Sequence, residues 1–156
     1  MVSHDTLMEQ NPVYRDLWVR NVEVCAECNK EIQRIARYEA EHPAPNGPDP
    51  EYLATLRAMY HRTNELNRQS GELRKQIRQE WNRAQTEEAR QKTGFKEGDR
   101  VEYFARSFCG IGGETVTGTV KLYRGLLRVR LDRPWHDGRR YIGIGIGWRP
   151  LAALEA

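Results

Sequence analysis

The feature that most constrains this chain is a change in hydrophobic periodicity close to residue 94. Before Gly94, apolar residues recur every three or four positions, which is the spacing of one face of an α-helix. After Gly94, apolar and polar residues alternate, which is the spacing of a half-buried β-strand. The sequence therefore predicts an α+β protein with helices over 1–93 and a small antiparallel β domain over 94–156.

The first predicted helix spans about 5–42 and is ended by a proline-rich segment. Its apolar stripe, which Asn21 interrupts, consists of Tyr14, Trp18, Cys25, Cys28, Ile32 and Ile35. The following segment, HPAPNGPDP, contains four prolines, and we assign the loop to 43–50. Proline lacks a backbone N–H and restricts the residue before it, so a helix cannot continue through this segment.

The second predicted helix spans about 50–92 and begins with Asp49, Pro50 and Glu51, a capping carboxylate followed by proline in the first turn. Its apolar positions alternate by four and three residues, which is a heptad pattern. Two such helices joined by a short loop are expected to form an antiparallel, coiled-coil-like hairpin. The seam residues that we expect to mediate helix packing, self-association or docking are Trp18, Ile32, Ile35, Leu56, Met59, Leu66, Leu73, Ile77 and Trp81.

Four segments of the C-terminal part are predicted to be strands, at 99–106, 114–123, 126–131 and 139–148. Asp137-Gly138 is a strong signal for a hairpin between the last two, because glycine adopts the positive φ that a tight turn requires. Short antiparallel strands at this density predict a small closed or half-closed barrel.

Two stretches of this part resemble the small SH3-like barrels, and in particular the KOW-type domains. FKEGDRVEYF at 95–104 resembles the entry to their first strand, with a turn at Gly98-Asp99 and with Val101 and Tyr103 pointing inward. GETVTGTVKLYRGLLRVRLD at 113–132 is similar to their glycine-bearing second strand, tight turn and alternating third strand. The resemblance implies a barrel that binds RNA, DNA or protein as an attachment to a larger assembly.

The segment YIGIGIGW at 141–148 alternates isoleucine with glycine. In a strand, Ile142, Ile144 and Ile146 would share the inner face, and the glycines at 143, 145 and 147 would share the outer face. Three interpretations remain open. The glycines let the strand coil around a small barrel, they clear a floor for another backbone or base, or the strand is an edge to which another strand adds.

Positive charge is concentrated in the C-terminal part. Residues 95–156 hold 11 Lys and Arg against 7 Asp and Glu, a net charge of +4, whereas residues 1–94 hold 14 against 15, a net charge of −1. This asymmetry favours an anionic partner for the β domain. The predicted contact residues for nucleic acid or another partner are Lys121, Tyr123, Arg128, Arg130, Arg139, Arg140, Gly143, Gly145, Gly147, Trp148 and Arg149.

The sequence offers no motif for catalysis or for a cofactor, so we predict a protein that is not an enzyme and has no cofactor. Cys25 and Cys28 have the spacing of half a zinc site, but a second half is not evident, and their place on the apolar stripe favours packing. His136 beside Asp137 is interpreted as a solvated loop residue. The Ile/Gly repeat is not followed by the helix that a dinucleotide-binding loop requires.

Two functions fit these features. In the first, the protein is a non-catalytic binding or adaptor protein whose hairpin self-associates or docks and whose basic barrel contacts nucleic acid or a nucleoprotein complex. In the alternative, it is a protein-directed inhibitor or assembly factor, for instance one encoded by a phage or mobile element, and it blocks a partner complex without binding nucleic acid. The absence of a long apolar run and of an apolar leader, together with the odd cysteine count, predicts a cytoplasmic protein with no membrane contact.

Overall fold

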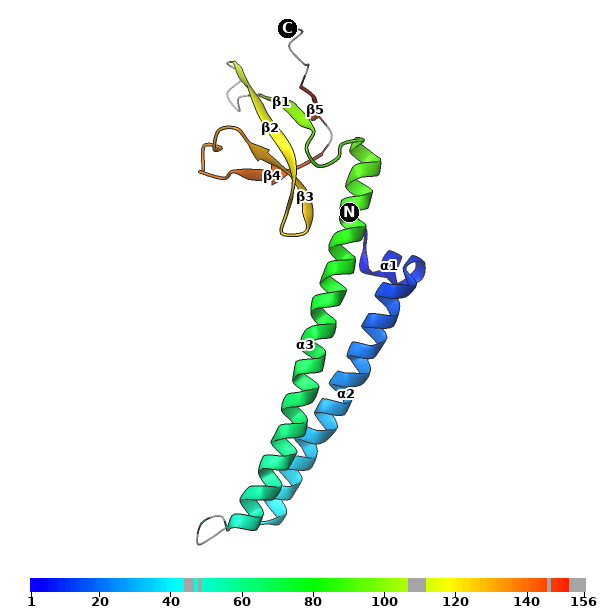
Figure 1. Ribbon diagram of the computed structural model, residues 1–156, viewed down its shortest axis with the longest axis vertical. Helices are drawn as coiled ribbons and strands as arrows, with labels where there is room; N and C mark the ends of the chain where they lie inside the picture. The colour runs from blue at the N-terminus through cyan, green and yellow to red at the C-terminus, as the bar shows by residue number, and fades with distance from the viewer. Residues whose placement is uncertain (44–46, 48, 107–111, 146, 152–156) are drawn as a thin grey trace. The chain divides into compact units, whose positions relative to one another are not determined.

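The computed structural model describes residues 1–43, 47, 49–106, 112–145 and 147–151. Over these residues the chain forms three helices followed by five strands, which confirms the α+β class (Figure 1). The chain divides into two compact units. One is His4–Glu80, and the other is Trp81–Ala156 together with Met1–Ser3.

The single helix predicted over 5–42 is two helices, α1 at His4–Gln10 and α2 at Pro12–Glu41. The break falls at Asn11, whose backbone is extended and whose side-chain oxygen accepts a hydrogen bond from the Tyr14 N–H at 2.9 Å. Proline disfavours helical geometry in the residue before it, and Pro12 is well suited to the first position of a new helix. The Asn-Pro pair is therefore an N-terminal cap.

Helix α3 runs from Pro50 to Thr93, as predicted to within a residue, and its first part forms an antiparallel hairpin with α2 (Figure 1). Asn11 Nδ2 donates to Glu80 at 3.4 Å near one end of the hairpin, and the rings of Tyr38 and Tyr52 stack at 5.6 Å near the other. Between them, Ser70 Oγ donates to Asn21 Oδ1 at 2.8 Å. Asn21, which interrupts the apolar stripe of α2, therefore has a polar partner on α3.

The predicted seam on α2 merges two separate rows of side chains. Tyr14, Cys28 and Ile35 are buried, whereas Trp18 and Ile32, which we assigned to the same stripe, are 37% and 50% exposed. Residues seven apart lie on one row of a helix because seven residues are close to two turns. The buried row therefore runs through Tyr14, Asn21, Cys28 and Ile35, and a second row runs through Trp18, Cys25 and Ile32. On α3, Leu66 and Ile77 are buried, and Leu56, Met59 and Leu73 are partly buried.

The C-terminal strands form one antiparallel sheet. They are β1 (Arg100–Arg106), β2 (Gly113–Tyr123), β3 (Leu126–Leu131), β4 (Tyr141–Gly143) and β5 (Arg149–Pro150), in the order β4-β3-β2-β1-β5. Over the described residues β4 pairs with β3, and β5 pairs with β1. The predicted antiparallel strands are therefore confirmed, whereas their closure into the closed or half-closed barrel that we expected is not.

The single strand predicted over 139–148 is not formed. The structure has two short strands in this region, β4 and β5, and Ile144 and Gly145 between them are not in a strand. Gly147 has a φ of +106°, which lies outside the extended region and ends any continuous strand. Ile146, one of the three predicted inward-facing isoleucines, lies outside the described residues.

The core of this unit lies on the inner face of the sheet. Its buried residues are Phe95, Val101, Val116, Val120, Leu127, Val129 and Leu131, and Ile142, Ile144, Trp148 and Ala89 pack against them. The last turns of α3 belong to this unit because Asn82 donates to the Arg124 carbonyl at 3.3 Å and Thr86 to the Gly125 carbonyl at 3.2 Å. The two compact units therefore divide between Glu80 and Trp81, inside α3. The sequence pattern had placed the domain boundary at the end of this helix, between residues 93 and 94.

Gly118 is required by a close approach of β2 and β3. A Cβ at this position would lie 2.5 Å from Val129 Cγ1 and 2.6 Å from the Arg130 carbonyl oxygen. We expect Gly118→Ala to lower the free energy of unfolding by about 1–3 kcal/mol, the effect of overpacking a buried site. Chemical denaturation measures this. The matched control is Gly143→Ala, where a Cβ meets nothing within 4 Å, and equal destabilisation of both variants would contradict the prediction.

Candidate functional site

The outer face of the sheet carries two cross-strand rows of polar side chains. In one row Lys121 pairs with Arg128, and Arg128 pairs with Gly143. In the next, Arg130 lies between Thr119 and Tyr141. Directly opposite residues of an antiparallel pair share a face, and the intervening Val120, Val129 and Ile142 face the core. The predicted hairpin therefore places Arg128 beside Gly143, as the sequence suggested.

Two tyrosines lie on the same outer face. The rings of Tyr123 and Tyr141 stack with centroids 4.0 Å apart and an interplanar angle of 11°. The Arg124 guanidinium carbon lies 5.3 Å from the Tyr123 ring centroid, within the range of a cation–π contact. Tyr123 was among the contact residues predicted from sequence and Tyr141 was not, although Tyr141 is two residues before Gly143 and therefore shares its face.

Three arginines of the β domain are neutralised by nearby carboxylates. Arg100 binds Asp132 through two hydrogen bonds of 2.7 and 2.6 Å, Arg139 Nε lies 2.6 Å from Asp137, and Arg149 Nε lies 2.7 Å from Glu102. Over the part of the chain that the structure describes, no ion pair involves Lys121, Arg128 or Arg130. The charge of these three outer-face cations therefore remains available to a ligand.

Several predicted contact residues lie elsewhere. Trp148 packs against the core with its ring 5.4 Å from that of Tyr103. Burial of the large indole ring is more favourable than leaving it in water on the outer face. A Cβ on Gly147 would lie 3.0 Å from the Tyr103 ring, so this glycine serves a turn and a close contact and adds nothing to an open strip. Arg149 is in β5, at the opposite edge of the sheet from β4. Arg140 is exposed in the turn before β4.

The open part of the glycine row is Gly143 and Gly145. Both are exposed, and a Cβ on either would meet nothing within 4 Å. They border a cavity of about 290 Å³ whose walls also include Leu126 and Arg128 from β3 and Ala89 and Lys92 from the last turns of α3. The glycines therefore leave backbone accessible beside Arg128.

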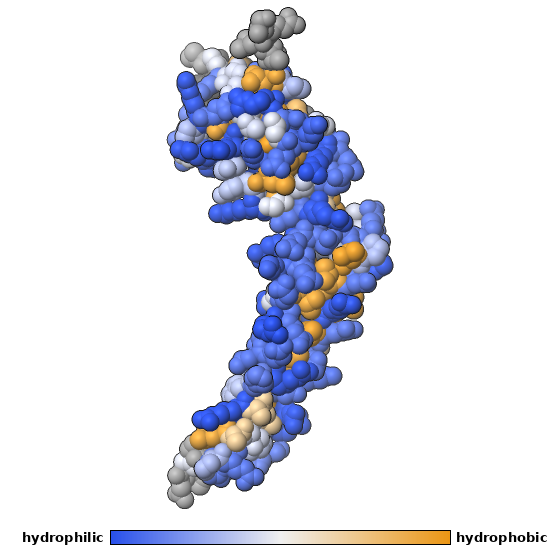
Figure 2. All heavy atoms as spheres, in the orientation of Figure 1, coloured by the Kyte–Doolittle hydropathy of each residue, from blue (hydrophilic) through white to orange (hydrophobic). Residues whose placement is uncertain are grey.

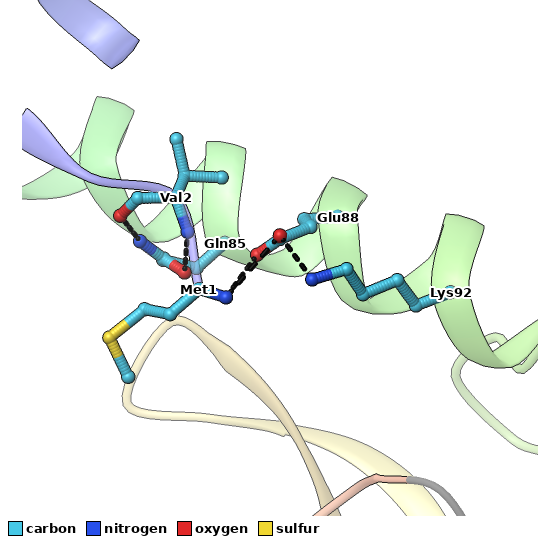
Figure 3. A network of polar contacts seen from close by, with 5 residues as sticks. All are labelled: Met1, Val2, Gln85, Glu88 and Lys92. Atoms are coloured by element: carbon cyan, nitrogen blue, oxygen red, sulfur yellow. Dashed lines mark hydrogen bonds and ion pairs between the residues drawn. The ribbon is translucent and has the colours of Figure 1, made fainter. Parts of the chain in front are cut away.

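The first residues of the chain are held against α3 by a polar network at the rim of this cavity (Figure 3). The Val2 N–H donates to Gln85 Oε1 at 3.1 Å, and Gln85 Nε2 donates to the Val2 carbonyl at 2.7 Å. Glu88 pairs with Lys92 Nζ at 2.6 Å and with the Met1 amino group at 3.0 Å. Lys92 and then the Met1 amino group lower the pKa of Glu88, which therefore stays ionised.

The two cysteines of α2 do not form a metal site with other groups that the structure describes. Cys28 is buried with its thiol 3.5 Å from Asn67 Oδ1, and Cys25, which we expected in the core, is exposed with its sulfur 3.5 Å from Ser70 Oγ. Within the described ranges no three His, Cys, Asp or Glu side chains group closely enough to hold a metal ion. Cys109 lies outside the described residues.

Comparison with protein-family models, with curated proteins and with solved structures found no match to this chain. Among the described helices, none combines the length and apolar character needed to cross a membrane.

The Arg100–Asp132 pair gives a pH-dependent contribution to stability. Hydrogen bonds from Arg100 and then Thr117 lower the pKa of Asp132 to about 2. A carboxyl whose pKa falls on folding stabilises the protein above its unfolded pKa of about 3.9, and this contribution is lost as the pH falls through the folded pKa.

We therefore expect Asp132→Asn to lower the free energy of unfolding at pH 7, by no more than about 1 kcal/mol because both partners are more than one third exposed. Chemical denaturation at pH values from 7 to 2.5 should show the wild-type and variant curves converging below pH 4. A constant difference across this range would contradict the prediction.

Proposed function

We propose that this protein is a non-catalytic binding protein that contacts single-stranded nucleic acid through the outer face of its sheet. The observation that carries the proposal is the combination of Lys121, Arg128 and Arg130 with the stacked pair Tyr123 and Tyr141 on one face. Cations bind the phosphate chain in any sequence, and aromatic rings stack on bases.

The arrangement of the cations suits a phosphate chain. Lys121 and Arg128 are direct neighbours on adjacent strands, which lie about 4.8 Å apart, and Arg130 is two residues along from Arg128. Arginine binds phosphate oxygens through a planar fork of donors, and a single strand can adjust its backbone to this spacing. Beside Arg128, Gly143 lets a ligand approach the main chain without meeting a side chain.

The remaining parts of the proposal concern the fold family and the hairpin. The likeness to SH3-like and KOW-type domains agrees with a nucleic-acid ligand, although members of such folds bind many ligands and the fold alone does not choose one. The helical hairpin, which carries exposed apolar residues on α2, is proposed to join the binding domain to a second protein surface.

Removal of the two unpaired arginines should weaken nucleic-acid binding. In fluorescence anisotropy titrations with labelled single-stranded DNA and RNA, Arg128→Ala combined with Arg130→Ala should reduce affinity. The plot of log K against log salt should become shallower by about 1.4, because each phosphate of a single strand that is no longer neutralised lowers the slope by about 0.7.

The matched control replaces cations that the protein already neutralises. Arg139→Ala combined with Arg149→Ala removes the same formal charge and should change affinity and salt slope much less, since both side chains are bound to carboxylates. Equal effects of the two double variants would contradict a specific outer-face site. Absence of binding by the wild-type protein to DNA and RNA, single- or double-stranded, would favour a protein-directed inhibitor or assembly factor.

Stacking on the tyrosine pair is tested separately from charge. Tyr141→Ala should lower single-strand affinity by about 5- to 100-fold, the range for removing one stacked base, with an unchanged salt slope. Tyr141→Phe keeps the ring and should bind almost as the wild type does. The proposal of a stacked base would be wrong if the two variants bound equally, or if duplexes bound more tightly than single strands.

A further inference from the structure

Helix α2 carries a second apolar stripe that α3 leaves largely exposed, although Cys25 at its edge contacts Ser70 of α3 at 3.5 Å. This stripe runs for about five turns of the helix without a charged residue. Its residues are Trp18, Val19, Val22, Cys25, Ala26, Asn29, Ile32, Gln33 and Ala36. Four of its large side chains are exposed, by 37% at Trp18, 45% at Val19, 53% at Val22 and 50% at Ile32. Apolar side chains remain visible along the hairpin in the space-filling view (Figure 2).

The second stripe is distinct from the face that packs on α3. At 100° per residue, its centre lies roughly 100° around α2 from the row through Tyr14, Asn21, Cys28 and Ile35. Among the described residues, α1 reaches one end of the stripe, where the His4 ring lies 4.5 Å from the Trp18 ring. A helix with two apolar stripes at this angle is built to pack against two neighbours, and the hairpin supplies one.

A row of charged residues borders the second stripe on the side away from α3. It consists of Asp16, Glu23, Lys30 and Arg37, spaced seven residues apart, so that two acids are followed by two bases. All four are exposed, and none has an ion pair among the described residues. This order of charges is complementary to itself when the direction of the helix is reversed.

We propose that the protein forms an antiparallel homodimer in which the second stripe of α2 packs against the same stripe of a second copy. The two-fold axis passes close to Cys25 and Ala26. In this arrangement Glu23 lies opposite Lys30 of the second copy, and Asp16 lies opposite Arg37 of the second copy. Residues that flank the seam of an antiparallel helix pair face their own row, so all four charge pairs of the dimer are favourable.

The apolar residues fit the same arrangement. Trp18 lies opposite Ile32 of the second copy, and Val22 lies opposite Asn29. The small side chain of Ala26, beside Cys25, lies at the axis, where it lets the two helices approach closely. If the two copies of α2 packed in parallel, their charged rows would lie on opposite sides of the seam. The two rows would then not face each other, and their opposite charges could not pair.

The test is a charge exchange measured by sedimentation equilibrium on the full chain. The wild type should be a dimer. Glu23→Lys and Lys30→Glu should each weaken the dimer by about tenfold, because two exposed ion pairs per dimer become like-charge contacts. The double variant Glu23→Lys with Lys30→Glu should restore the wild-type dissociation constant. Glu72→Lys, which makes the same charge change on exposed α3, should have no effect.

A second variant tests the stripe itself. Val22→Glu adds a charge at a position that is 53% exposed in one copy, so circular dichroism should show unchanged helix content while dimerisation is abolished. A monomeric wild type at tens of micromolar would overturn the proposal. So would a double charge variant as weak as the single variants, which would show that the two rows do not face each other.

Discussion

The outer face of the sheet depends on the burial of its inner face. Val101, Val120 and Val129 are fully buried, and each anchors a strand in one register against its neighbour. A shift of one residue would turn these valines outward and carry Lys121, Arg128 and Arg130 into the core. Burying three unpaired cations is far more costly than burying valines. The apolar register of the sheet is therefore also what presents its basic side chains together.

The hairpin depends on a comparable constraint, the seven-residue repeat of α2. One row of that repeat is satisfied by α3, including the Asn21–Ser70 hydrogen bond between its polar members. The second stripe is contacted within the chain at Trp18 by His4 and at Cys25 by Ser70, and most of its large side chains stay exposed. The self-complementary charges beside it make a second copy the partner that suits both. The two proposals place nucleic-acid binding and dimerisation on different units, so each can fail without the other.

Several elements could be predicted from sequence because they depend on contacts close in the chain. The end of α2 before the proline-rich segment, the start of α3 at Asp49-Pro50, the β2–β3 turn and the hairpin at Asp137-Gly138 are all local. The break at Asn11-Pro12 was also local, and its capping signal was overlooked. Tyr141 could have been assigned to the outer face by counting two residues back from Gly143. Trp148 could not be placed by such counting, since its burial against Tyr103 joins residues far apart in the chain.

The sequence by itself determined the fold class, the extent of α3, the β3–β4 pairing and the face on which Arg128 and Arg130 lie. These follow from periodicity and turn chemistry, which act over a few residues. The tertiary structure alone decided which row of α2 is buried, which arginines are neutralised by Asp132, Asp137 and Glu102, and that the strands among the described residues form an open sheet. Such outcomes depend on where distant side chains meet in space, and one-dimensional spacing carries no information about that.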